Sequence, residues 1–271
     1  MSIPKILHQT WKTDDVPKVF AKYVESWKEN HLDWEYRLWT DEENRRFISH
    51  HYSWFLKTYD GYPSPIQRAD AIRYFLLHKF GGLYVDLDFM SCKPIVPLLR
   101  GRKCVIGKEP IEHCREFAMP KILCNALMAT VPGHPFFETV IHRLTEFADP
   151  VDDTQPVLTS TGPFMLTRVY DEFEQQESMD VVPSEDLYPL TKEQADQLLL
   201  TGEVNVDLSG AYAIHLHYGS WWRPDRQAEL GTLLAGELHP NQRRVRQWIV
   251  SAIAALVSAI AATFSWLSLG S

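Results

Sequence analysis

The sequence predicts an α/β protein in which helices flank a mixed sheet. Segments with helical spacing of apolar residues alternate along the chain with short runs rich in β-branched and aromatic residues. This alternation, without an internal repeat, is typical of a layered α/β domain. With 271 residues, the chain is long enough to bury a full core in one large domain.

Strands are expected at residues 3–11 and 34–39, and helices at 16–29, 41–50 and 52–59. Thr40 and Glu43 have the spacing of a capping box at the start of the helix over 41–50. Ser64, Pro65 and Gln67 mark the start of another helix, which runs to about residue 79 and ends at Gly81.

The second half of the chain carries weaker signals. Strands are expected at 103–107 and 211–217, a short strand at 187–190, and either a strand or a helix at 122–130. Helices are expected at 135–147 and 164–173, the second opened by a loop over 159–163.

The composition places the chain among ordinary globular proteins, with 45% hydrophobic and 23% charged residues. The net charge of −8 predicts no broad basic surface, so nucleic acid is not an expected partner. Nine tryptophans fit carbohydrate stacking or core packing equally well. The four cysteines form no C-x-x-C pair, which disfavours a zinc site and leaves buried thiols or one or two disulfides. They are Cys92, Cys104, Cys114 and Cys124.

The chemistry is concentrated where an apolar run, residues 83–85, ends in Asp86 and Asp88. At a strand tip this spacing lets two carboxylates reach one divalent cation, which keeps positions open for phosphate oxygens. Asp70 and Arg73 share a face of the preceding helix, so we expect three acids and one guanidinium in one neighbourhood. These residues predict an enzyme that acts on a nucleotide diphosphate.

Residues 247–271 carry no charge, and Arg243, Arg244 and Arg246 precede them. About 21 helical residues span about 32 Å, enough for a bilayer core. We therefore expect a globular domain over 1–240, then a basic linker and an apolar C-terminal helix over 241–271 that associates with a membrane. A terminal helix buried on the domain is the alternative. No signal peptide is expected before the first strand.

Residues 65–75 and 81–88 together resemble the DXD-type glycosyltransferases of the sugar-binding-region family, glycosyltransferase family 32. Residues 6–11 resemble its opening strand, residues 125–129 with 133–137 its middle block, and His215 with residues 219–221 its closing block. The resemblance covers about residues 3–222. The wording of residues 65–70 is most similar to the mannosyl-inositol-phosphorylceramide synthases. The family also includes the initiating α-1,6-mannosyltransferases.

This resemblance implies a Rossmann-like GT-A fold that binds a nucleotide sugar with Mn²⁺ or Mg²⁺ and retains anomeric configuration. Asp88 would ligate the metal directly, and Asp86 would contact the ribose or sugar and the metal's water. Asp70 and Arg73 would hold sugar hydroxyls and the diphosphate. Trp11 would stack on the base, and Asn125 would lie near the donor sugar. The diphosphate and metal would be covered by His215, Ser220 and Trp221.

The implied reaction moves mannose from GDP-mannose to a lipid-linked or glycan acceptor such as inositol phosphorylceramide. One alternative transfers glucose, galactose or N-acetylglucosamine from a UDP-sugar to protein or polysaccharide. Another is a non-catalytic sugar- or lipid-binding module. A phosphohydrolase with Asp86 as nucleophile is disfavoured, because Met90 stands where that chemistry usually has Thr or Val. We expect a membrane-associated protein with a cytoplasmic catalytic domain, with the Golgi membrane as the alternative.

Several of these residues also have a structural interpretation. Asp70 and Arg73 have the spacing of a surface ion pair on a helix. Trp11 is alternatively a core residue that does not stack on a base. His8 is expected to be a hydrogen-bonded structural histidine, and His215 is either a metal or phosphate ligand or a core histidine.

Overall fold

The computed structural model describes residues 2–148 and 155–219. The chain divides into two compact units, the first comprising residues 1–191 and 207–215, the second 192–206 and 216–271. The predicted boundary at residue 240 and the tail over 241–271 lie outside the described residues, so both stay predictions. In the part of the chain that is described, no helix combines the length and apolar character needed to cross a membrane.

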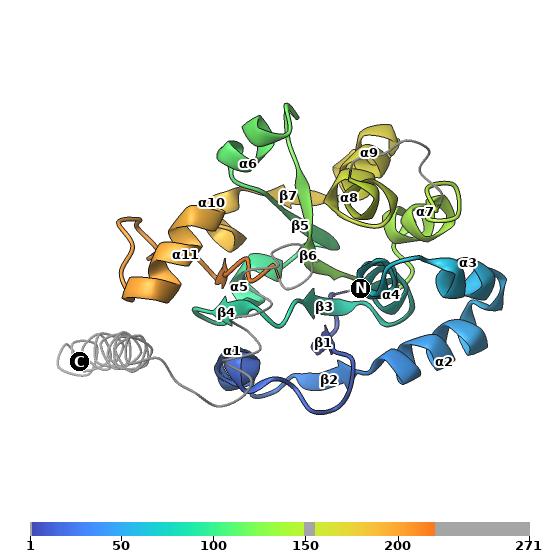
Figure 1. Ribbon diagram of the computed structural model, residues 1–271, viewed down its shortest axis with the longest axis horizontal. Coiled ribbons are helices and arrows are strands. Elements are labelled where there is room, and N and C mark those ends of the chain that lie inside the picture. The colour runs from blue at the N-terminus through green and yellow to red at the C-terminus, as the bar shows by residue number, and fades with distance from the viewer. Residues whose placement is uncertain (1, 149–154, 220–271) are drawn as a thin grey trace. The chain divides into compact units, whose positions relative to one another are not determined.

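The first unit is built on a six-stranded sheet (Figure 1). Its strand order is β2 (Glu35–Trp39), β1 (Ile6–Thr10), β3 (Gly82–Val85), β6 (Leu123–Thr130), β5 (Cys104–Lys108) and β7 (Asp180–Val182). β1 runs parallel to β2 and β3, β7 runs parallel to β5, and β6 is antiparallel to both its neighbours. A separate antiparallel pair joins β4 (Phe89–Ser91) to β8 (Ala213–His215). The predicted α/β fold with a mixed sheet is confirmed.

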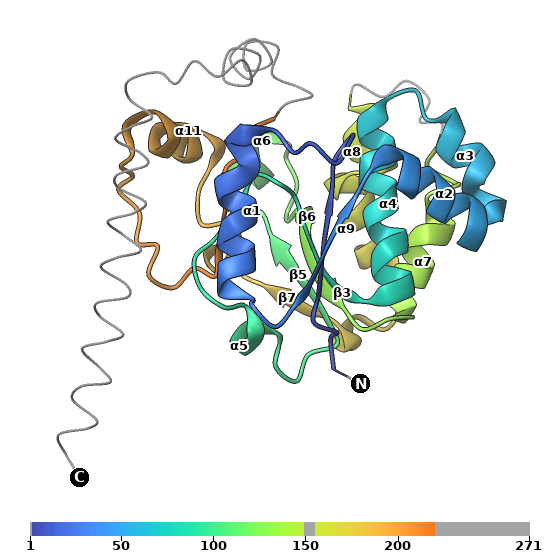
Figure 2. The same ribbon diagram turned by 90° about the horizontal axis from the view of Figure 1, so that it is seen from below.

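Helices cover both faces of this sheet, and Figure 2 shows α1 and α4 on opposite sides of the strands. Side chains alternate along β3, so Tyr84 packs into one core cluster and Leu83 and Val85 into the other. The Tyr84 side is covered by α2 (Asp41–His51), α3 (Leu56–Gly61), α4 (Pro65–Phe80), α7 (Pro135–Arg143) and α9 (Pro163–Glu172). The other side is covered by α1 (Lys18–Asn30), α5 (Val96–Leu99) and α10 (Ser184–Leu187).

The remaining elements are short. They are the 3₁₀ helices η1 (Ser53–Phe55) and η2 (Gln176–Ser178) and the helices α6 (Ile111–Glu116) and α8 (Pro156–Ser160). In the second unit, α11 (Lys192–Thr201) buries Ala195 and Leu198.

The start of α4 is fixed by its predicted cap. The Ser64 amide donates to Gln67 Oε1 at 3.0 Å, and the Gln67 amide group donates to Ser160 Oγ at 2.8 Å. Pro65 occupies the first turn, where no hydrogen-bond donor is needed. This end of α4 is therefore tied both to its own first turn and to α8.

The turn from α4 into β3 depends on two glycines with positive φ, 63° at Gly81 and 91° at Gly82. A Cβ on Gly82 would lie 2.5 Å from the Ile6 carbonyl oxygen, so only glycine lets β3 pass this close to β1. The Trp39 indole donates to His8 Nδ1 at 3.1 Å, and His8 Nε2 lies 3.0 Å from the Gly81 carbonyl oxygen. Burial lowers the pKa of His8 to about 4, so the neutral ring donates from Nε2. His8 is the structural histidine that the sequence predicts.

Most predicted elements are confirmed, and the ambiguous segment 122–130 is a strand. The short strand predicted at 187–190 is wrong, because Leu187 ends α10 and its apolar neighbours are buried by packing rather than by pairing in a sheet. The loop predicted at 159–163 is wrong at its start, where α8 continues to Ser160. β7 was not predicted. The four cysteines are free thiols, which excludes the disulfide alternative.

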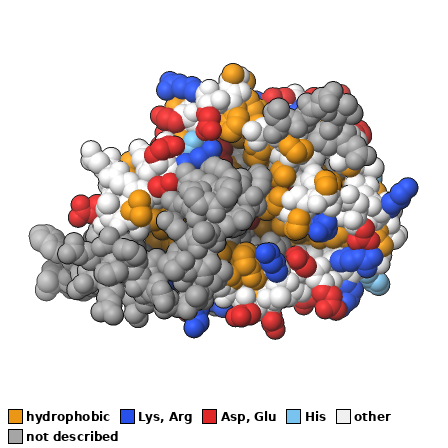
Figure 3. Space-filling model, viewed as in Figure 1, with side chains coloured by type: hydrophobic (Ala, Val, Ile, Leu, Met, Phe, Trp, Pro, Cys, Tyr) orange, Lys and Arg blue, Asp and Glu red, His pale blue; other side chains and the backbone are white. Residues whose placement is uncertain are grey.

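Charged side chains of both signs are interspersed over the described part of the face in Figure 3, with hydrophobic side chains between them. Several are paired at the surface, as in Arg45 with Asp60 and Arg46 with Glu42. Such exposed pairs contribute at most about 1 kcal/mol each, so they do not decide the fold.

We predict that Gly82→Ala lowers the free energy of unfolding by more than about 1 kcal/mol, because the new Cβ meets backbone at a positive φ. Gly61→Ala is the matched control, since Gly61 ends α3 with no atom near its Cβ position. Denaturant unfolding of both variants measures the effect. Equal stability of the two variants would contradict the close approach of β3 to β1.

Candidate active site

The predicted site residues that the structure describes gather at one edge of the sheet. β1 and β3 are parallel, so their carboxyl ends meet at this edge, and the antiparallel β6 begins there. Asp86 and Asp88 lie in the turn between β3 and β4. The Asp86 amide donates to the Ala126 carbonyl oxygen at 2.9 Å, which places Asn125 beside the turn.

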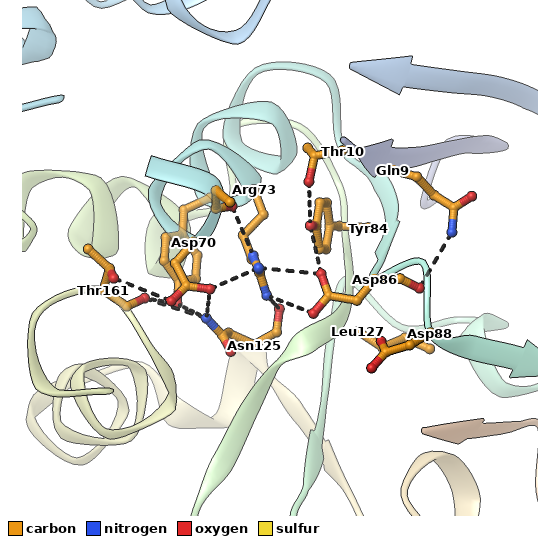
Figure 4. A network of polar contacts seen from close by, with 12 residues as sticks. Gln9, Thr10, Asp70, Arg73, Tyr84, Asp86, Asp88, Asn125, Leu127 and Thr161 are labelled. Carbon is orange, nitrogen blue, oxygen red and sulfur yellow. Dashed lines mark hydrogen bonds and ion pairs between the residues drawn. The ribbon is translucent and has the colours of Figure 1, made fainter. Parts of the chain in front are cut away.

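Arg73 of α4 lies at the centre of this group and is only 3% exposed (Figure 4). Nη2 lies 2.8 Å from Asp70 Oδ1 and 3.3 Å from Asp86 Oδ1, and Nη1 donates to Asp86 Oδ2 at 3.3 Å. Nη1 also donates to the Asn125 carbonyl oxygen at 3.0 Å, and Nε donates to that of Ala69 at 3.3 Å. Each of the three guanidinium nitrogens therefore lies within 3.3 Å of at least one protein oxygen. The alternative of a surface ion pair is wrong.

Asp70 is 6% exposed and held by groups from three elements. Besides Arg73, the Asn125 amide donates to Oδ1 at 3.2 Å and the Thr161 hydroxyl donates to Oδ2 at 3.3 Å. Burial raises the pKa of Asp70 to about 7, against the pull of Arg73 and these two hydrogen bonds. Asp70 is thus a carboxyl group that gains or loses its proton near neutral pH.

Asp86 faces Arg73 on one side and opens to solvent on the other, with 26% of its side chain exposed. The Tyr84 hydroxyl donates to Asp86 Oδ1 at 2.8 Å and lies 3.0 Å from the Thr10 hydroxyl of β1. Gln9 donates to the Asp86 carbonyl oxygen at 3.4 Å. Burial raises the pKa of Asp86 and Asp88 adds to that, while Arg73 and Tyr84 oppose it.

Asp88 turns away from this network toward His215 at the end of β8. Asp88 Oδ2 lies 3.4 Å from His215 Nε2, and their side chains are 14% and 12% exposed. β4 pairs Phe89 directly with His215, and their rings stack at 4.4 Å between centroids. Burial, the largest single effect, lowers the pKa of His215, but the carboxylates of Asp88, Glu109 and Asp86 together outweigh it, so the net direction is upward.

The types of donor atom in Asp86, Asp88 and His215 fit a divalent cation. Asp86 and Asp88 supply the carboxylate oxygens that Mn²⁺ and Mg²⁺ prefer, and His215 adds an imidazole nitrogen that suits Mn²⁺ better than Mg²⁺. The remaining exposure of Asp86 and Asp88 leaves a route for a ligand to reach their oxygens.

The other predicted site residues are placed as follows. Trp11 follows β1 at this same edge, is half-buried, and meets Phe20 edge to face at 5.8 Å. Asn125 lies inside the network and also donates to the Tyr74 hydroxyl at 3.0 Å. Ser220 and Trp221 lie outside the described residues.

Sequence reasoning did not identify Tyr84, Thr161 or Gln9 as members of this network. The contact of Tyr84 with Asp86 could have been predicted, because Tyr84 lies two residues before Asp86 and so faces the same side of the strand. Thr161 reaches Asp70 from a segment 91 residues away, and no local pattern announces that contact.

Comparison with known proteins places the acids and the arginine of this site within a region that matches a glycosyltransferase family. Residues 17–106 match the family described as "Glycosyltransferase sugar-binding region containing DXD motif". This region of the chain is similar to the DXD-motif glycosyltransferase family. It contains Asp70, Arg73, Asp86 and Asp88, and the resemblance expected from the sequence is confirmed.

Several similar proteins are named for mannosyl transfer. Inositol phosphoceramide mannosyltransferase 3 of Schizosaccharomyces pombe is 41% identical over 172 residues, which cover 62% of this chain and 45% of that protein. Mannosyl phosphorylinositol ceramide synthase CSH1 of Saccharomyces cerevisiae is 38% identical, covering 63% and 43%. The chain thus spans about half the length of the curated relatives it matches. A solved structure titled "PaToxG Glycosyltransferase" superposes with a TM-score of 0.48 at 18% identity, over 65% of this chain and 72% of that one, too loosely to support an argument.

The raised pKa of Asp70 predicts a pH-dependent contribution to stability. Folding raises this pKa from 3.8 to about 7, so the folded state holds the proton more tightly than the unfolded state. The stabilisation from this proton is complete at a pH below the pKa of Asp70 in the unfolded state. It is lost as the pH rises through the pKa of Asp70 in the folded state, about 7. The free energy of unfolding of the wild type should therefore fall relative to that of Asp70→Asn as pH rises from about 4 to about 8. Denaturant titrations across this range measure the difference, and parallel curves would contradict the buried, protonatable Asp70.

Proposed function

We propose that this protein is a metal-dependent glycosyltransferase with a GT-A type domain that transfers a sugar from a nucleotide donor and retains its anomeric configuration. The observation that carries the proposal is the group of buried contacts at the sheet edge. One arginine binds the carboxylates of Asp70 and Asp86, while Asp88, two residues on, meets His215. This group provides a place for a divalent ion beside fixed acids, which is what a departing diphosphate requires.

We propose mannose as the sugar, GDP-mannose as the donor and an inositol phosphoceramide as the acceptor. The support comes from the relatives at 41% and 38% identity, both named for mannosyl transfer to that class of lipid. A lipid acceptor also agrees with the charge-free segment over 247–271, which we propose brings the domain to a membrane surface.

In this proposal Asp86, Asp88 and His215 hold the Mn²⁺ or Mg²⁺ ion. When bound, the ion would offset the charge that develops on the departing diphosphate. Trp11 stacks on the donor base, and Asn125, Ser220 and Trp221 contact the donor at the sugar and diphosphate.

Arg73 acts mainly as a positioning residue, because its N–H groups are already directed at protein oxygens. It fixes Asp70 and Asp86 in place and limits the repulsion between them. Asp70, with a pKa of about 7, exchanges a proton within the working pH range and so serves as donor or acceptor to a sugar hydroxyl. The deep burial of both residues keeps water from competing for these contacts.

The test is a transfer assay with GDP-mannose, Mn²⁺ and inositol phosphoceramide, run beside UDP-glucose, UDP-galactose and UDP-N-acetylglucosamine. We predict mannose transfer, lost on chelation, and a fall of about 100-fold or more in Asp88→Asn with the fold retained, because the ion loses a charged ligand. Asp33→Asn is the control, since Asp33 is an exposed carboxylate that forms an ion pair with exposed Lys5. If the protein transfers sugar only from a UDP-sugar, the proposal of GDP-mannose as donor is wrong. If Asp88→Asn turns over normally, the proposal that Asp88 binds the metal ion is wrong.

A further inference from the structure

Glu109 and Cys124, which the proposed reaction does not use, form a second cluster with His215. Glu109 follows β5, Cys124 belongs to β6 and His215 ends β8. One potential ligand atom from each of these three residues lies within 4.8 Å of the other two. Cys124 is 3% exposed, and 11% of the Glu109 side chain is exposed, so the cluster is well shielded from solvent.

Strand pairing brings the three residues together. The Glu109 amide donates to the Ile122 carbonyl oxygen at 2.9 Å where β5 and β6 run side by side, so Glu109 comes next to Cys124. His215 arrives through the pairing of β8 with β4, the strand that follows the Asp88 turn. The Cys124 thiol makes a hydrogen bond with the Glu109 carboxylate.

The Glu109 carboxylate is held from outside the cluster. His113, one turn along α6, places Nδ1 2.8 Å from Glu109 Oε2, and its side chain is only 6% exposed. A ligating carboxylate or imidazole in a metal site is commonly fixed by such an outer hydrogen bond, which sets its orientation in advance. Glu109 therefore resembles a prepared ligand more than a surface acid.

The donor types select the metal. A thiolate, an imidazole and a carboxylate together suit Zn²⁺, whereas Mn²⁺ and Mg²⁺ favour oxygen-rich sites. Ligands around a tetrahedral Zn²⁺ lie about 3.3–3.8 Å apart, given metal–ligand distances of about 2.0–2.3 Å. The separations within the cluster, all below 4.8 Å, need to contract by only about 1 Å.

We propose that Glu109, Cys124 and His215 form a Zn²⁺ site that shares His215 with the site of the catalytic ion, and that its occupation inhibits the transferase. Binding forms a bond from sulfur to Zn²⁺ as the Cys124 thiol releases its proton to water. His215 Nε2 also lies 3.4 Å from Asp88 Oδ2, so a zinc ion that binds the imidazole would compete with the catalytic ion for this ring. Only the inhibition rests on the proposed function, because binding is a property of these side chains alone.

Cobalt titration of the full chain tests the binding. Co²⁺ bound to a thiolate gives a charge-transfer absorption in the near ultraviolet, which we expect in the wild type and in Cys104→Ser, a control at another buried thiol. Cys124→Ser should lose this absorption, and Zn²⁺ should displace Co²⁺ from the wild type. Glu109→Gln, checked for folding by circular dichroism, should weaken Zn²⁺ affinity about tenfold or more while keeping the thiol. An unchanged absorption in Cys124→Ser would overturn the site.

Transfer assays at fixed Mn²⁺ with rising Zn²⁺ test the inhibition. Each variant is compared with its own rate without zinc, and Cys124→Ser should resist zinc about tenfold better than Cys104→Ser. Equal sensitivity of the two variants would overturn the inhibitory role. If no donor is turned over, the proposed function fails, while the cobalt spectrum still decides whether the zinc site exists.

Discussion

The guanidinium of Arg73, buried between the carboxylates of Asp70 and Asp86, is the interaction on which the site depends. Removing one partner of a buried ion pair costs about 3–5 kcal/mol, because it leaves a charge without water or a counterion. Here two carboxylates share one cation, and Tyr84, Asn125 and Thr161 supply further hydrogen bonds to them. The site therefore exists only while α4 and β3 keep their relative positions.

Several structural features serve that constraint. The cap at Ser64 and the contact of Gln67 with Ser160 fix the first turns of α4, which carry Asp70 and Arg73. Gly81 and Gly82 then allow the chain to turn sharply into β3 and lie against β1. The family match covers these parts, over residues 17–106. Asn125 and His215 lie beyond it and reach the same edge through β6 and β8.

The sequence predicts what is encoded locally. The cap of α4, the glycine turn and the Asp-x-Asp pair are short-range patterns, and they were sufficient to expect that Asp70, Arg73 and Asp86 would meet. The segment at 187–190 was mistaken for a strand because burial of apolar residues in a loop has the same local pattern as a buried strand. The contact of Thr161 with Asp70 and the cluster of Glu109 with Cys124 arise from distant segments, so no local spacing predicts them.

The most direct measurement of the central claim is a double-mutant cycle of unfolding free energies with Arg73→Met, Asp86→Asn and the double variant. If the buried guanidinium and the Asp86 carboxylate compensate each other, the double variant is less destabilised than the sum of the single variants by more than about 1 kcal/mol. Arg73→Met leaves the Asp86 carboxylate without its cation, Asp86→Asn leaves Arg73 with Asp70 as its remaining carboxylate, and the double variant removes both members of the pair under test. Single effects that add to within about 0.5 kcal/mol would show that the two side chains do not depend on each other, which contradicts the account.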